Sequence, residues 1–503
     1  MRKILLASAA VLGTAGGAWA QTPTYQSQGT VALPWTNFYG ANTNINANGT
    51  AQPGGARLPD PGTVVIHLNG RVYADVDLSW SSLGNIPAGA NPPNPSYKSN
   101  PLGIGSYLRL YPGFDGVATN GLRYGASAEI RQNIMSANVF NASVSQAGST
   151  GSYASGSGYS SAETLFTRRA FTYFGSDQLG IIRIGQDDGV VGLFDATGVF
   201  TVGTWNLTAG ILDGDTEAYQ PNGNLISWAW LSGNGIEYDQ QRISYMSPSF
   251  FGVDFAMDFS PSTANAFGNG STSGPYQTGT CIVESANCDN VTGGADSSRP
   301  YNRVSAGVRY QGSFSGLDVK AFALYTHSAG ESITSVPNGG LQAGPGLPSL
   351  TTSGNTLKYD GQSFFNVAAA LGFQGIAVNA NFADGRFNPG NNGLTPSGGV
   401  NTVGTLIGVG YSNGPWVTGT NVAFVDWQGN AQYTHISQRH EFAFTYMVGY
   451  KLAPGINLAA EYLYIQKHQG GYDFYTGGAN TKTTAVGNDI HTQGLTFATI
   501  LSW

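Results

Sequence analysis

Segments in which apolar and polar side chains alternate recur along most of this 503-residue chain. In VDFAMDFS (253–260), valine, phenylalanine and methionine alternate with aspartate, alanine and serine. A period of two places successive side chains on opposite faces of a β-strand. The chain is therefore predicted to be all-β, with one apolar face and one polar or small face on each strand.

Sixteen segments have this pattern or a β-rich composition close to it. The predicted strands are 63–80, 104–111, 121–132, 163–174, 180–186, 240–247, 252–260, 301–311, 317–327, 362–373, 376–383, 402–411, 417–427, 439–452, 456–467 and 491–503.

The connections between these strands alternate strictly between short and long. The short ones have roughly two to nine residues, and the long ones reach 187–239. This arrangement is typical of an even-stranded antiparallel transmembrane β-barrel with short periplasmic turns and long external loops. Sandwiches and propellers do not sort their loops by length in this way.

Two features favour a barrel with its apolar face outward and its polar face inward. Sixteen strands enclose a lumen too wide for side chains to fill, and only 10% of the residues are charged, far below the usual quarter. Aromatic residues at strand ends resemble interfacial girdles; the alternative is that they cap the core of a soluble barrel. They are Trp80, Tyr111, Phe174, Tyr310, Phe373, Tyr411, Trp416, Trp427, Tyr450 and Trp503.

Both ends of the chain carry information. Residues 1–20 combine a basic start, a short apolar run and Ala18-Trp-Ala20, which is the pattern of a cleaved secretory signal peptide. Residues 21–60 are predicted to be an N-terminal periplasmic extension, and 61–503 the barrel. The last strand ends on Trp503 and is expected to close the barrel against the first.

The net charge of −7 becomes −9 without Arg2 and Lys3, which argues against a nucleic-acid partner. Cys281 and Cys288 are predicted to form a local disulfide, because a close pair after a secretion signal favours one. The alternative, half of a metal site, finds no neighbouring cysteine or histidine in the sequence.

Enzymatic chemistry is not indicated. Ser412 lies in a G-x-S-x-G match, but a nucleophile elbow requires a strand–turn–helix context, and this match joins two predicted strands. The six histidines are scattered, and His435 and His440 are poorly spaced for one metal. No phosphate loop or cofactor motif is found. We therefore predict no catalytic residue, no metal and no cofactor.

Several stretches resemble the general porins of the Gram-negative outer membrane, most closely those of alphaproteobacteria. RLPDPGTVVIHLNGRVYADVDLSW (57–80) resembles their opening strand, and TRRAFTYFGSDQLGIIRIGQD (167–187) their fourth and fifth strands. QRISYMSPSFFGVDFAMDFSPS (241–262), YKLAPGINLAAEYLYIQK (450–467) and the aromatic C-terminus complete the resemblance, which extends from Arg57 to Trp503.

The resemblance implies a homotrimer in outer-membrane lipid, inserted by the barrel-assembly machinery through the strand ending at Trp503. It also implies that the third long loop, 187–239, folds inward and narrows the pore opposite an arginine-lined wall. The acidic side would comprise Asp187, Asp188, Asp195, Asp213, Asp215 and Glu217. The basic side would comprise Arg71, Arg109, Arg123, Arg131, Arg183 and Arg242.

Two alternatives stay open for this wall. Opposed acid and base can set a field across the pore, or the arginines can simply pair with neighbours such as Glu129, Asp75 and Asp77. The main functional hypothesis is passive diffusion of small hydrophilic solutes and ions. A carbohydrate- or polyol-selective porin is the alternative, with aromatic residues of the third loop as stacking surfaces. An outer-membrane enzyme or adhesin barrel is the remote alternative.

Overall fold

The structure is a computed structural model. It describes residues 60–82, 85–86, 97–98, 101–133, 166–176, 178–187, 189–190, 240–262, 301–334, 356–387, 395–428, 438–473, 478–479 and 488–503. None of these residues belongs to a helix long and apolar enough to cross a membrane.

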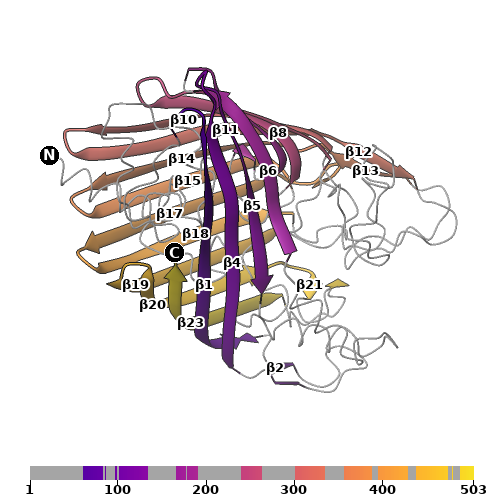
Figure 1. Cartoon of the computed structure of the whole chain (residues 1–503). Coiled ribbons are helices and arrows are strands. Elements are labelled where there is room, and N and C mark those ends of the chain that lie inside the picture. Colours follow the sequence, from indigo (N-terminus) through magenta and orange to yellow (C-terminus); the bar gives the residue numbers. More distant parts are fainter. Residues whose placement is uncertain are drawn as a thin grey trace, which may run out of the picture.

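Sixteen antiparallel strands form a closed barrel (Figure 1), which confirms the predicted fold class. Each strand pairs with its barrel neighbours in the chain, and β1 pairs with β23 to close the ring. The strands are β1 (Thr63–Ser81), β4 (Leu102–Val117), β5 (Arg123–Asn133), β6 (Phe166–Ser176), β7 (Gly180–Asp187), β8 (Gln240–Met246), β9 (Val253–Ser262), β10 (Tyr301–Phe314), β11 (Leu317–Ala329), β14 (Ser363–Phe373), β15 (Ile376–Arg386), β17 (Thr402–Asn413), β18 (Trp416–Trp427), β19 (Arg439–Ala453), β20 (Ile456–His468) and β23 (Asp489–Ser502).

Three small sheets lie outside the barrel, all within the long connections. They pair β2 (Asn85–Ile86) with β3 (Tyr97–Lys98), β13 (Thr356–Asp360) with β12 (Glu331–Thr334) and β16 (Thr395–Pro396), and β21 (Tyr472–Asp473) with β22 (Gly478–Ala479).

The short connections gather at one end of the barrel, which we call the short-turn end. Two of them, Ser315-Gly316 and Gln374-Gly375, have positive φ at both residues. This is the backbone of type I′ turns, whose twist matches that of the flanking strands. The opposite end is called the long-connection end.

The two faces of the barrel wall differ as the alternation predicts. On β9, Phe255 and Met257 are 44% and 47% exposed, whereas Asp254 and Asp258 are 7% and 2% exposed. Apolar side chains are exposed on the outside and polar ones are buried on the inside, which is the reverse of a soluble barrel.

Two threonine hydroxyls on the outer face are hydrogen-bonded to backbone carbonyls of the neighbouring strand. Thr418 Oγ1 donates to the Met447 carbonyl at 2.8 Å, and Thr420 Oγ1 donates to the Thr445 carbonyl at 2.7 Å. Their polar atoms are therefore paired with the neighbouring strand, as an apolar surrounding requires.

Two details of the sequence prediction were wrong. The second barrel strand was predicted to end at Tyr111, but it extends to Val117. Pro112, which lacks an N–H, lies within the strand opposite Leu68 of β1. Tyr111 and Trp427, assigned to the outer girdles, are 1% and 5% exposed and share the inward parity of Arg109 and Val425.

The closure between β1 and β23 is built around a glycine. Gly70 N donates to the Trp503 carbonyl, and Trp503 N donates to the Gly70 carbonyl, both at 3.2 Å. A Cβ at Gly70 would overlap the Trp503 indole. The missing side chain of Gly70 thus provides the space for the tryptophan, and the expected closure by the last strand is confirmed.

Candidate functional site

Arginines occupy one row of register positions on the first three barrel strands. Arg71 of β1 lies directly opposite Arg109 of β4, and Arg109 lies opposite Arg131 of β5. The side chains of Arg71 and Arg109 are 4% and 2% exposed, while the side chain of Arg131 lies outside the described part. Arg71 and Arg109 thus place two positive charges side by side on this part of the wall. Like charges directly opposite each other are unfavourable for stability.

Acidic partners lie on the neighbouring strands. Arg169 of β6 pairs with Glu129 of β5 at 2.6 Å, and Arg309 of β10 pairs with Asp254 of β9 at 2.9 Å. Both pairs are buried. Neither Arg169 nor Arg309 was among the arginines predicted for the wall.

Asp187 and Arg183 form a further buried ion pair, within β7. The Arg183 guanidinium also lies 4.0 Å from the centre of the Phe171 ring, a cation–π geometry. Asp187 was predicted as part of the third loop. It is instead the last residue of β7, so it belongs to the wall where the long connection leaves it.

Asp258 of β9 joins the wall to the beginning of that connection. Its Oδ1 accepts from Arg242 Nη1 at 2.9 Å, and its Oδ2 accepts from the backbone N–H of Val190 at 2.8 Å. Arg242 Nε also donates to the Asp187 carbonyl at 2.9 Å. One buried carboxylate therefore fixes both an arginine of the wall and the backbone three residues after β7.

The predicted site residues fall into three groups. Arg71, Arg109, Arg183 and Arg242 are buried on the inward face, and Arg123 is half-buried with the same parity near the short-turn end. Arg131 has the inward register position. Outside the described residues lie Asp188, Asp195, Asp213, Asp215, Glu217, Cys281 and Cys288.

The prediction missed inward charges on later strands. Arg303 and Arg309 were on the polar face of their strand in the sequence, but the basic wall was confined to the first six strands. Arg169 was missed because Phe171 and Tyr173, which share its face, make that face look apolar. Strict parity would have identified Arg303 and Arg309 but not Arg169.

The other part of the wall, β11 to β18, contrasts with the arginine side. Buried asparagines gather here: Asn366 on β14, Asn379 and Asn381 on β15, and Asn421 on β18. Asn366 Nδ2 donates to Asn381 Oδ1 at 3.1 Å, and Asn379, Gly408 and Asn421 lie side by side in register. We call the four asparagines, Asn366, Asn379, Asn381 and Asn421, the asparagine cluster.

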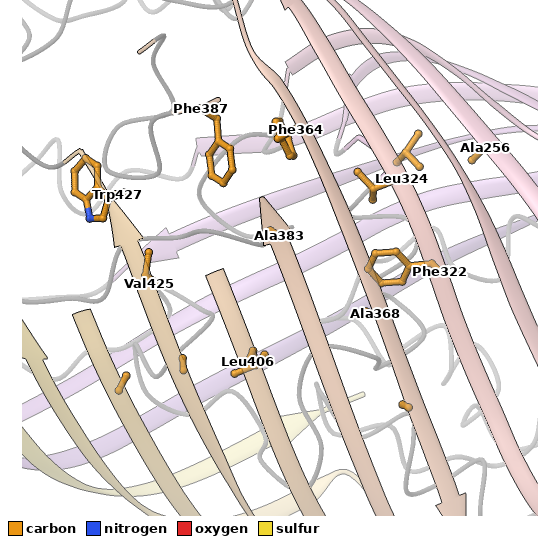
Figure 2. Close-up of a cluster of buried hydrophobic side chains, with 14 of the residues drawn as sticks. Ala256, Phe322, Leu324, Phe364, Ala368, Ala383, Phe387, Leu406, Val425 and Trp427 are labelled. Atoms are coloured by element: carbon orange, nitrogen blue, oxygen red, sulfur yellow. The ribbon is translucent and has the colours of Figure 1, made fainter. Parts of the chain in front are cut away.

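Apolar side chains surround the asparagine cluster on the same strands. Figure 2 shows Phe322 and Leu324 of β11, Phe364 of β14 and Leu406 of β17 within one buried group. The rings of Phe364 and Phe387 lie 4.6 Å apart. The inner wall thus carries charges from β1 to β11, where Asp318 and Lys320 lie near the short-turn end, and none at the described inward positions of β14 to β18.

No catalytic constellation is apparent in the described ranges. No group of three or more His, Cys, Asp or Glu side chains is placed there to hold a metal ion. Ser412 lies at the end of β17, beside the turn to β18, with its N–H donating to the Gly375 carbonyl at 2.8 Å. That environment is a strand pairing and not a nucleophile elbow.

No family model and no curated protein matches the chain. Solved structures with a similar course include OmpT, an outer membrane protein of Vibrio cholerae in its trimer form, at 10% identity and a TM-score of 0.46, covering 88% of this chain and 100% of that one. A mutant of the Rh. blastica porin has 11% identity and a TM-score of 0.43, covering 87% and 100%. An anion-selective porin from Comamonas acidovorans has 14% identity and a TM-score of 0.44, covering 88% and 100%.

Proposed function

We propose that this chain is an outer-membrane porin through which small hydrophilic solutes and ions diffuse passively. The observation that carries the proposal is the inverted wall: a closed sixteen-stranded barrel with exposed apolar side chains outside and buried charges inside. Such a wall suits a lipid surrounding and a polar lumen. A barrel that binds an apolar ligand in water would have the opposite faces.

Within this proposal the arginines of the wall and the acids of the third connection bound the narrowest part of the pore. The hydrogen bonds of Asp258 to Arg242 and to Val190 support this, because they hold the start of the connection against the inner wall. The basic side comprises Arg71, Arg109, Arg123, Arg131, Arg183 and Arg242. The acidic side comprises Asp187 at the end of β7 and, in the connection, Asp188, Asp195, Asp213, Asp215 and Glu217.

The remaining parts of the proposal concern export and assembly. We propose cleavage of a signal peptide at 1–20, a periplasmic extension over 21–60 and a disulfide between Cys281 and Cys288. We also propose a homotrimer in outer-membrane lipid, inserted by the barrel-assembly machinery, which would recognise the strand ending at Trp503.

Single-channel conductance in a planar bilayer, under a tenfold KCl gradient, tests the proposal. Steps that open together and close in thirds support a trimeric pore. A reversal potential on the cation side would mean that the acids set the ion selectivity, and one on the anion side would mean that the arginines set it. Absence of conductance from correctly folded protein would contradict an open channel and favour a plugged, enzymatic or adhesive barrel.

The asparagine cluster favours a second candidate, a porin selective for carbohydrates or polyols. Amide groups donate and accept hydrogen bonds without charge, which suits hydroxyl groups, and the nearby Phe364 and Phe387 rings offer apolar faces. Saturable block of conductance by an uncharged sugar, weakened in N381L and unchanged in the outer-face variant R386Q, would support it. Block that does not saturate would leave simple diffusion.

A further inference from the structure

The outer face of the barrel carries a row of two carboxylates and two histidines at the long-connection end. Asp426 of β18, His440 of β19, His468 of β20 and Asp489 of β23 lie directly opposite one another in register. All four have the outward parity of their strands. Their side chains are 48%, 56%, 48% and 62% exposed, in that order.

Each histidine is hydrogen-bonded to the carboxylate on the neighbouring strand that lies away from the other histidine. His440 Nδ1 lies 2.5 Å from Asp426 Oδ1, and His468 Nδ1 lies 2.7 Å from Asp489 Oδ1. An ionised carboxylate only accepts hydrogen bonds, so each Nδ1 carries the proton and each neutral ring keeps its lone pair on Nε2.

Each ring therefore has its Nε2 on the side away from its carboxylate. The two nitrogens lie on nearly opposite sides of an imidazole, and both carboxylates occupy the sides facing away from the histidine pair. Opposed residues in an antiparallel pair have Cβ atoms about 4.5–5.5 Å apart. The two Nε2 lone pairs thus belong to rings at directly opposed positions of β19 and β20.

We propose that His440 and His468 bind a divalent transition-metal ion such as Zn²⁺ through their Nε2 atoms. Imidazole nitrogen is a favoured ligand for Zn²⁺, Ni²⁺ and Cu²⁺. A carboxylate on the other ring nitrogen is the usual partner of a metal-binding histidine, which it orients and makes more basic. Asp426 and Asp489 are positioning residues, and water supplies the remaining ligands.

The surroundings of the pair agree with a site open to water. The outward residues one step toward the short-turn end include Phe424 and Phe442, whose rings lie 5.3 Å apart. Phe442 in turn lies 6.2 Å from the Tyr464 ring. This neighbouring row is aromatic on β18 and β19, whereas its members on β20 and β23 are the exposed Gln466 and His491. Because it lies on the outer face, the site is independent of the proposed pore.

Calorimetric titration of the folded full-length protein in detergent with ZnCl₂ tests the proposal. The expected result is one high-affinity ion per chain. D426N or D489N should weaken the affinity about tenfold or more, the size typical for loss of such a partner, and H440Q or H468Q should weaken it further. H327Q is the matched control, because His327 is also exposed near the long-connection end, on β11, and faces Ser363.

Spectroscopy provides a second readout. The electron paramagnetic resonance signal of bound Cu²⁺ should show coupling to two nitrogens in the wild type and in H327Q, and to one at most in H440Q. Unchanged affinity and nitrogen coupling in H440Q and H468Q, with folding verified by circular dichroism, would overturn the proposal. So would the absence of Zn²⁺ binding by the wild-type protein.

Discussion

Two arginine–aspartate pairs of nearly equal length lie in opposite surroundings. Arg242 and Asp258 are 2.9 Å apart with side chains 1% and 0% exposed, whereas Arg386 and Asp360 are 3.0 Å apart with side chains 44% and 29% exposed. An exposed pair contributes little, because water and salt screen it. Removing one partner of a buried pair leaves a charge without compensation.

This contrast gives a prediction at the scale of single residues. D258N should lower the free energy of unfolding by about 3–5 kcal/mol, because Arg242 loses its carboxylate in a buried place. D360N should change it by about 0–1 kcal/mol. Guanidinium unfolding in detergent, followed by tryptophan fluorescence, measures both, and equal effects of the two variants would contradict the argument.

At the scale of elements, the pairing of β1 with β23 differs from the other neighbouring pairs of the barrel because it joins strands from opposite ends of the described chain. Its register from Arg71 to Ser81 is continuous. Beyond it, the closure depends on the backbone exchange between Gly70 and Trp503 and on the space that glycine leaves.

We expect G70A to destabilise the barrel by about 1–3 kcal/mol, because the new methyl group must displace the indole. A double-mutant cycle isolates the cause. In a W503A background the same substitution should cost much less, since no ring remains to be displaced. An equal cost in both backgrounds would place the strain in the β1 backbone and not against Trp503.

The row formed by Arg71 and Arg109 gives a prediction for adjacent strands. If the proposed pore conducts, the double variant R71Q/R109Q should move the reversal potential toward the cation side, because two positive charges leave one stretch of wall. R386Q removes an exposed arginine from the outer face and serves as the control. A shift of equal size in the control would mean that the selectivity is not set by the inner wall.

At the scale of the whole molecule, alternation and connection length were sufficient to predict the barrel, its strand number and its inverted faces. These properties depend on a repeated local signal, and an error of a few residues at a boundary leaves the parity unchanged. The details that failed, Pro112 within β4 and the inward Tyr111 and Trp427, are places where residue type and position pointed in different directions.

The site was less predictable for a physical reason. Parity assigns a side chain to a face, but it does not identify its partner across the lumen or along the wall. The pairs Arg169–Glu129 and Arg309–Asp254 depend on register between strands, and a register cannot be read from one strand alone. The division into a charged and an uncharged wall became visible only when the strands were placed in order.

The glycine in the middle of the asparagine cluster has a consequence for how related sequences can vary. Gly408 lies between Asn379 and Asn421, and a Cβ there would overlap the side-chain oxygens of both. Position 408 therefore cannot gain a side chain without strain while both asparagines remain. Across diverged relatives we expect the three positions to covary: wherever position 408 acquires a side chain, positions 379 and 421 should become smaller, and a long residue at either should be inherited together with the glycine.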